Sequence, residues 1–144
     1  MVDESLLKEL KAIQEAGAAS ASANNLLKMY EFIKQISVEN EDLKEELEDM
    51  DIAIQLILTD ADTKTWMTVK DGVLNYGEGD VDNPSFTLSS NLEVGAGIML
   101  GEVDATSAYM AGDITVEGNL QDAMAFQEII ELALEAYEDL VEDL

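Results

Sequence analysis

The sequence predicts a single α+β domain in which helices cover one face of an antiparallel sheet. With 144 residues, the chain is close to the commonest size of one domain. Hydrophobic residues make up 47% of it, which is enough for a core despite a net charge of -25. The apolar spacing is helical up to about residue 50, alternates afterwards and returns to a helical spacing at the end. This order of elements is typical of an α+β fold.

Three helices are predicted in the first third of the chain. The first covers residues 3–15, and the small residues of 16–23 form a loose connection after it. A cap at Asn24 or Asn25 opens the second helix, and Ser37 is available to cap the third. The second helix has an apolar stripe, and the third contributes two leucines; in order these residues are Leu26, Met29, Tyr30, Ile33, Ile36, Leu43 and Leu47.

An alternation of two residues predicts strands from residue 51 onward. Residues 52–58 carry four large apolar side chains on one face. Asp71-Gly72 is a favoured hairpin dipeptide between strands over 65–70 and 73–78, and a further short strand follows Pro84. These strands form an antiparallel meander.

The last third of the chain predicts a helix, a strand and a long helix. The helix covers residues 90–100 despite Gly95 and Gly97, the strand runs from Tyr109 to Glu117, and the final amphipathic helix runs from Leu120 to about Asp143. The glycines do not form a dinucleotide fingerprint, because they lie within a helical pattern of an antiparallel protein. We expect them to allow close packing or to leave room for a ligand.

The charge excludes several classes of function. The chain has 32 acidic residues against 7 lysines, so its surface repels phosphate backbones and anionic lipid headgroups. We expect no nucleic-acid partner and no stable membrane insertion. The acidity fits either a salt-rich cytoplasm or a basic protein partner.

The composition also argues against catalysis. The sequence has no Cys, His or Arg, which removes disulfides, thiolates, the usual general base and the commonest metal ligand. Nothing marks a pair of carboxylates as buried. We therefore expect no enzyme, no metal site and no cofactor. The acidic N-terminus and the lack of a long apolar run predict a cytoplasmic protein.

The most specific pattern lies in residues 101–124. It consists of a Gly after a helix, a short turn, an apolar pair, the string Gly112-x-Ile114-x-Val116-x-Gly118-Asn119, and an Ala-Met pair in the final helix. This stretch resembles the signature region of the sterol carrier protein family. The segments Ser85-Phe86-Thr87-Leu88-Ser89 and Lys70-Asp71-Gly72 are also similar to that family, so the likeness spans roughly residues 30–137.

The resemblance implies a twisted, five-stranded, mostly antiparallel sheet with helices on one face. It also implies a tunnel that binds an apolar ligand, namely a fatty acyl, sterol or isoprenoid lipid, for storage, transfer or presentation. On this basis we divide the chain into an N-terminal helix and connection over 1–23 and a lipid-binding domain over 24–144. The alternative is a non-catalytic interaction module or accessory subunit whose core is filled by its own side chains.

We expect nine apolar residues to line the cavity, with Gln127 as a polar contact to the ligand. Adaptable methionines suit promiscuous apolar pockets, although ordinary core packing is an equal alternative for each one. The expected lining is Ile33, Met67, Phe86, Leu88, Ala96, Met99, Met110, Met124 and Phe126.

The final helix continues beyond the extent that the resemblance requires. Its stripe consists of Phe126, Ile130, Leu134, Tyr137, Val141 and Leu144. We expect its last third to cap the cavity mouth, to pack on the N-terminal helix, or to form a homodimer seam, in that order. An acidic polar face disfavours docking on a membrane.

Overall fold

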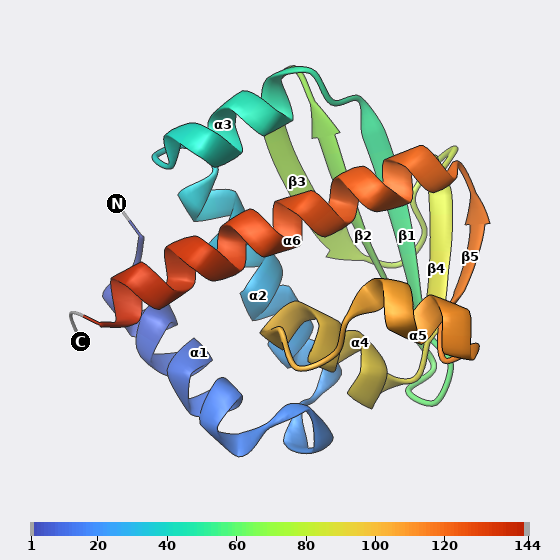
Figure 1. Ribbon diagram of the computed structural model, residues 1–144, viewed down its shortest axis with the longest axis horizontal. Coiled ribbons are helices and arrows are strands. Elements are labelled where there is room, and N and C mark those ends of the chain that lie inside the picture. Colours follow the sequence, from blue (N-terminus) through green and yellow to red (C-terminus); the bar gives the residue numbers. More distant parts are fainter. Residues whose placement is uncertain (1, 143–144) are drawn as a thin grey trace.

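A computed structural model describes residues 2–142 of the chain (Figure 1). The helices are α1 (Glu4–Ala16), the 3-10 turn η1 (Ala18–Ser20), α2 (Ala23–Ile36), α3 (Glu41–Glu48), α4 (Leu92–Leu100), α5 (Ala105–Ala111) and α6 (Leu120–Val141). The strands are β1 (Ile52–Leu58), β2 (Thr63–Lys70), β3 (Val73–Glu78), β4 (Phe86–Ser90) and β5 (Thr115–Gly118).

The five strands form one sheet in the order β3-β2-β1-β4-β5. Only β1 and β4 are parallel among these pairs, and the other three pairs are antiparallel. The predicted meander is therefore wrong for the strand after Pro84, because β4 crosses over to pair with β1 and not with β3. Ile54 lies opposite both Met67 and Phe86 in the register, and all three are buried. Directly paired residues share a face of the sheet, so these side chains form one apolar surface. The predicted α+β class with a mostly antiparallel sheet is confirmed.

The helices cover this apolar surface. Figure 1 shows α6 crossing the sheet diagonally, with α4 and α5 beside it. Two of the contacts between the helices and the strands illustrate this: the hydroxyl of Tyr30 on α2 lies 3.0 Å from Oγ1 of Thr65, and the rings of Phe126 on α6 and Phe86 on β4 are 6.1 Å apart. The core therefore lies between one sheet face and a layer of helices.

The segment α1 packs against this helical layer. It buries Leu6, Leu7 and Leu10 and contacts both α2 and α6. That residues 1–23 form a unit distinct from residues 24–144 stays a prediction.

Most of the predicted elements are confirmed. Strand β1 has the predicted bounds, and the turn after β2 has positive φ angles of 53° at Asp71 and 78° at Gly72. These angles are those of a type I′ hairpin, which explains the Asp-Gly dipeptide.

Two predicted helix caps are wrong. Ser22 caps α2, because its Oγ accepts a hydrogen bond from the Asn25 amide while Asn25 Oδ1 accepts one from the Ser22 amide. Asn40 caps α3 by accepting from the Leu43 amide, and Ser37 instead ends α2. The reciprocal pair at Ser22 satisfies two free amides at once, which a single Asn cap does not.

The predicted strand from Tyr109 to Glu117 is also wrong in its first half. Asp104 accepts hydrogen bonds from the amide and hydroxyl of Ser107 and so starts α5, and Gly112 ends this helix with a φ of 83°. The strand β5 begins only at Thr115. Tyr109 and Met110 consequently lie on a short helix, where an alternating pattern no longer predicts which side chain faces inward.

Candidate functional site

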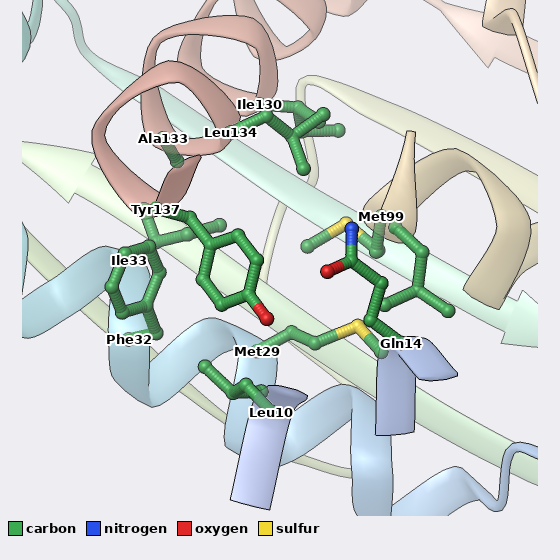
Figure 2. Close-up of a pocket in the computed structure, with 11 residues that line it drawn as sticks. Leu10, Gln14, Met29, Phe32, Ile33, Met99, Ile130, Ala133, Leu134 and Tyr137 are labelled. Carbon is green, nitrogen blue, oxygen red and sulfur yellow. The ribbon is translucent and has the colours of Figure 1, made fainter. Parts of the chain in front are cut away.

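A first apolar hollow, the helix pocket, lies among α1, α2, α4 and α6 (Figure 2). The space open to a water-sized sphere is about 40 Å³. Its lining consists of Leu10, Gln14, Met29, Phe32, Ile33, Met99, Leu100, Ile130, Ala133, Leu134 and Tyr137. The pocket is thus walled by helices alone and is nearly filled by its own side chains.

A second hollow, the sheet pocket, lies where α2, α4 and α6 meet the ends of β1 and β4. It has about 20 Å³ open to a water-sized sphere. Its lining consists of Leu26, Tyr30, Leu56, Ile57, Leu58, Leu88, Ser90, Gly95, Ile98, Met99 and Phe126.

A third hollow, the outer groove, lies at the surface between α5, β5 and the start of α6. Its volume is about 250 Å³. The lining is Leu88, Ala105, Thr106, Tyr109, Ile114, Val116, Leu120, Ala123, Met124 and Gln127. Tyr109, Leu120 and Met124 have exposed fractions of 46%, 52% and 69%, so the groove presents large apolar side chains to solvent.

The three hollows share side chains and therefore form a series. Leu88 lines both the outer groove and the sheet pocket, and Met99 lines both the sheet pocket and the helix pocket. The two inner spaces are far smaller than the roughly 300–1,000 Å³ of a typical ligand pocket. Leu88 thus lies between the outer groove and the sheet pocket, and Met99 lies between the sheet pocket and the helix pocket.

Polar groups are few in the helix pocket and the sheet pocket. In the sheet pocket, the Tyr30 hydroxyl pairs with Thr65 and the Ser90 hydroxyl donates to the Asn91 carbonyl. In the helix pocket, the Tyr137 ring packs edge-on against Phe32, with centroids 5.8 Å apart. Burial, and secondly the charge of Glu15, raises the pKa of Tyr137.

Six of the ten predicted site residues line one of these hollows. Ile33 and Met99 line the helix pocket, and Leu88 and Phe126 line the sheet pocket. Met124 and Gln127 lie at the outer groove. Gln127 accepts a hydrogen bond from the Thr106 hydroxyl and donates one to Glu131.

The other four predicted residues lie elsewhere. Met67, Phe86 and Ala96 are buried in the core but line none of the three hollows. Met110 lines none of them either and is 81% exposed, so the expectation that it faces inward is wrong. The same expectation is wrong for Met124, whose side chain is at the groove but 69% exposed. For Met110, the cause is the helical conformation of α5, which points it away from the core.

Several lining residues were not among the predicted site residues, chiefly those of α1 and the far part of α6. Leu10 and Gln14 lie on α1, and Tyr137 lies more than 100 residues later in the sequence. The hydroxyl of Tyr137 on an otherwise apolar stripe was a usable signal. The last third of α6 does pack on α1 and α2, while Leu144 lies outside the described residues.

Comparison with family models matches residues 11–131 to the SCP-2 sterol transfer family. The chain belongs to this family. The match covers the whole sheet and the three hollows' walls apart from Leu10, Ala133, Leu134 and Tyr137. No curated protein matches the chain significantly.

Solved structures of SCP-2 proteins share the fold. A structure titled UbiJ-SCP2 Ubiquinone synthesis protein has a TM-score of 0.60 and 13% identity, over 76% of this chain and 97% of that one. The sterol carrier protein domain 2 of Helicoverpa armigera has a TM-score of 0.59 and 17% identity, over 74% and 85%.

A larger protein contains a similar unit. The sec-alkylsulfatase Pisa1 from Pseudomonas sp. has a TM-score of 0.54 and 17% identity over 62% of this chain, which spans only 14% of the sulfatase. Among residues 2–142, none of the helices combines the length and the apolar character needed to cross a bilayer.

Proposed function

We propose that this SCP-2 family protein binds one lipid, of the fatty acyl, sterol or isoprenoid class, along the path from the outer groove to the helix pocket. The observation that carries the proposal is the sharing of Leu88 and Met99 between successive hollows. Membership of a sterol transfer family supports it. The protein would store the ligand or hand it to a partner.

The energetics allow such binding without polar contacts. A methylene group gains about 0.8 kcal/mol on burial, so roughly ten of them supply the 8 kcal/mol of a micromolar complex. The inner spaces must widen for this, because they now hold little more than water-sized volumes. Met99 is well suited to move, since a thioether side chain adopts many shapes at low cost.

We infer binding without chemistry on the ligand. The sequence contains no His, Cys or Arg, and the inner path carries only hydroxyl groups and one amide as polar groups. The net charge of -25 also disfavours collection of the ligand from anionic membranes. Delivery to or from another protein fits this charge better.

Displacement of a fluorescent long-chain probe tests the proposal. Met99→Trp blocks the junction between the two inner pockets, and we expect it to weaken probe binding by tenfold or more. Met110→Trp adds the same side chain at an exposed position of α5 outside the path, and we expect no change beyond twofold. Met99→Ala enlarges the junction, and we expect it to preserve binding.

Three results would contradict the proposal. The first is that the unmodified protein does not bind the probe saturably. The second is that Met99→Trp and Met110→Trp bind it equally well. The third is that Met99→Ala loses binding while its fold is intact. Circular dichroism of each variant separates loss of binding from loss of the fold.

The second candidate is a protein-interaction module with a self-filled core. The small inner volumes favour it, and so does the set of exposed apolar residues Tyr109, Met110, Leu120 and Met124. All seven lysines lie at or before Lys70. The four exposed apolar residues therefore lie in a half of the sequence that has acidic residues but no lysine. Such a surface suits a basic amphipathic helix.

This second function predicts that lipid-free protein binds a lysine-rich amphipathic peptide. It also predicts that Met124→Glu abolishes this binding. A homodimer through α6 is a further prediction, which light scattering of the purified protein tests directly.

A further inference from the structure

One polar atom in the helix pocket lacks a hydrogen-bond partner. Among the described residues, the hydroxyl of Tyr137 is the single buried side-chain nitrogen or oxygen without one. The side chain as a whole is 7% exposed. The buried polar side chains of Gln55, Thr65 and Ser90 all make hydrogen bonds. A buried hydroxyl without a hydrogen-bond partner is rare in folded proteins and needs a specific explanation.

The geometry places this hydroxyl inside the proposed ligand path. In Figure 2, the Tyr137 ring projects from α6 beside Phe32, and its oxygen points into the pocket toward Met29 and Leu10. Gln14 of α1 is the other polar side chain in the lining. Its amide makes no hydrogen bond within residues 2–142 and stands across the pocket in Figure 2. Among the lining residues, the Tyr137 hydroxyl is thus the buried polar group that lacks a partner, and the amide of the exposed Gln14 lies at the rim of the pocket.

We propose that the helix pocket holds the polar head of the ligand, and that this head is an uncharged hydrogen-bond acceptor such as an ester carbonyl or an alcohol. Tyr137 donates its hydroxyl proton to the head, and the Gln14 amide assists from the rim. This inference rests on the proposed function and specifies its ligand as a neutral amphiphile.

Electrostatics select a neutral head over a carboxylate. None of the eleven lining residues is a cation, so a buried carboxylate would lose its hydration without gaining a countercharge. Glu15 adds negative charge nearby, as its effect in raising the Tyr137 pKa shows, although burial is the larger cause. A carbonyl or hydroxyl oxygen has no such penalty and accepts from a phenol directly.

The Tyr137 hydroxyl borders a hollow that is large enough for a small polar group. A hollow of about 40 Å³ exceeds the roughly 10–15 Å³ that one water needs. The hollow therefore has room for a small polar group of the ligand beside the Tyr137 hydroxyl.

A series of C16 compounds with one variable end tests the inference. The compounds are methyl palmitate, 1-hexadecanol, palmitate and hexadecane, measured by displacement of the fluorescent probe from the full chain. We expect the ester and the alcohol to bind about 3- to 10-fold more tightly than hexadecane or palmitate, the range of one net hydrogen bond. In Tyr137→Phe this advantage disappears while hexadecane binding is unchanged.

The chain offers a matched control. Tyr76→Phe also removes a phenol oxygen, but that oxygen donates to Glu31 and Tyr76 lines none of the three hollows, so the variant keeps the preference for neutral heads. The infrared stretch of a ¹³C-labelled ester carbonyl gives an independent signature. It shifts to lower frequency when bound to the unmodified protein and not when bound to Tyr137→Phe.

The possible results separate the two proposals. If neither the fluorescent probe nor any of the four compounds binds, the proposed function fails. If all bind but Tyr137→Phe keeps the ester preference, or if palmitate binds most tightly, lipid binding stands and the assignment of the head is overturned.

Discussion

The hydroxyl of Tyr30 lies 3.0 Å from Oγ1 of Thr65, and both side chains are fully excluded from solvent. This hydrogen bond joins α2 to β2 and holds one wall of the sheet pocket, which Tyr30 lines. Burial raises the pKa of Tyr30 well above its ordinary range, and the bond to Thr65 opposes this only in part. The pair is therefore a neutral, buried link between the helical layer and the sheet.

We predict that Tyr30→Phe lowers the free energy of unfolding by about 1–3 kcal/mol, because Thr65 then becomes a buried hydroxyl without its partner. Urea unfolding followed by circular dichroism measures this. Adding Thr65→Val to the variant removes the second polar group and should recover most of the loss. Full stability of Tyr30→Phe alone would show that the link contributes nothing.

Tyr137→Phe should have the opposite effect on the ligand-free protein. Its hydroxyl has no protein partner, so removal should leave the free energy of unfolding unchanged within about 0.5 kcal/mol or raise it slightly. The same urea experiment decides this. A loss above about 1 kcal/mol would mean that the hydroxyl is well satisfied in the folded protein.

Much of the fold could be predicted because local patterns agree with tertiary packing. The alternation over Ile52–Leu58 identifies β1 because one face of this strand is buried, and Asp71-Gly72 identifies the hairpin because few other dipeptides adopt two positive φ angles. The helix α5 was missed because its seven residues give too few turns for a helical period, and Tyr109 and Ile114 favour strands on propensity alone. Its limits depend on the caps at Asp104 and Gly112.

The site was predicted less completely than the fold. Leu88, Met99 and Phe126 were expected to line a cavity, and the structure places them in the lining of the sheet pocket. Leu10, Gln14 and Tyr137 meet only because α1 and the end of α6 pack on α2, a contact between chain ends that no local pattern reports. Buried residues such as Met67 and Phe86 look the same in sequence as lining residues, since cavity volume depends on packing between distant elements.

Gly97 allows α4 to approach the loop after it. An added Cβ at Gly97 would lie 2.6 Å from Cγ2 of Val103, a branched side chain with little freedom to move. We predict that Gly97→Ala costs about 1–3 kcal/mol through overpacking, which outweighs the gain in helix propensity of about 1 kcal/mol. Thermal or urea unfolding tests this.

Val103→Ala removes the obstructing methyl groups and serves as the rescue. The double variant Gly97→Ala with Val103→Ala should therefore be more stable than the sum of the two single effects predicts. Strict additivity would contradict the steric explanation.

Glu46 on α3 and Glu128 on α6 provide a pH-dependent contact between these helices. A hydrogen bond to Glu128, then burial and the charges of Glu128 and Asp49, raises the pKa of Glu46 above its ordinary value of 4.5. The folded state therefore binds this proton more tightly than the unfolded state does. The stabilisation is complete below pH 4.5 and is lost as the pH rises through the raised pKa.

Glu46→Gln should hold the hydrogen bond at every pH. We predict that the variant is more stable than the unmodified protein at pH 7, by less than about 1 kcal/mol because Glu128 is exposed and Glu46 is only partly buried, and that the difference vanishes as the pH falls below 4.5. Glu45→Gln removes the same charge from an exposed position of α3 and is the control. An identical pH dependence of the two variants would assign the effect to net charge alone.

The excess of negative charge should make stability depend on salt. The described ion pairs, Lys8–Glu4, Lys28–Glu9 and Lys64–Asp80, engage only three of the 32 acidic residues and are solvent-exposed. Repulsion among the remaining carboxylates weakens as the Debye length falls from about 10 Å at 0.1 M salt to about 3 Å at 1 M. We predict that the midpoint of urea unfolding rises between 0.05 and 1 M NaCl.

The exposed face of α6 is a sensitive place to test this repulsion. Glu135, Glu138 and Glu142 follow one another at spacings of three and four residues, where like charges destabilise a helix by about 0.2–0.5 kcal/mol per pair. Changing all three to Gln should raise stability at 0.05 M NaCl by about 0.5–1 kcal/mol and should reduce the response to salt. The opposite result is a triple variant that gains no stability at low salt and responds to NaCl as the unmodified protein does. In that case charge repulsion does not explain the salt dependence. Exclusion of salt from apolar surface explains it better, because this effect does not depend on these carboxylates.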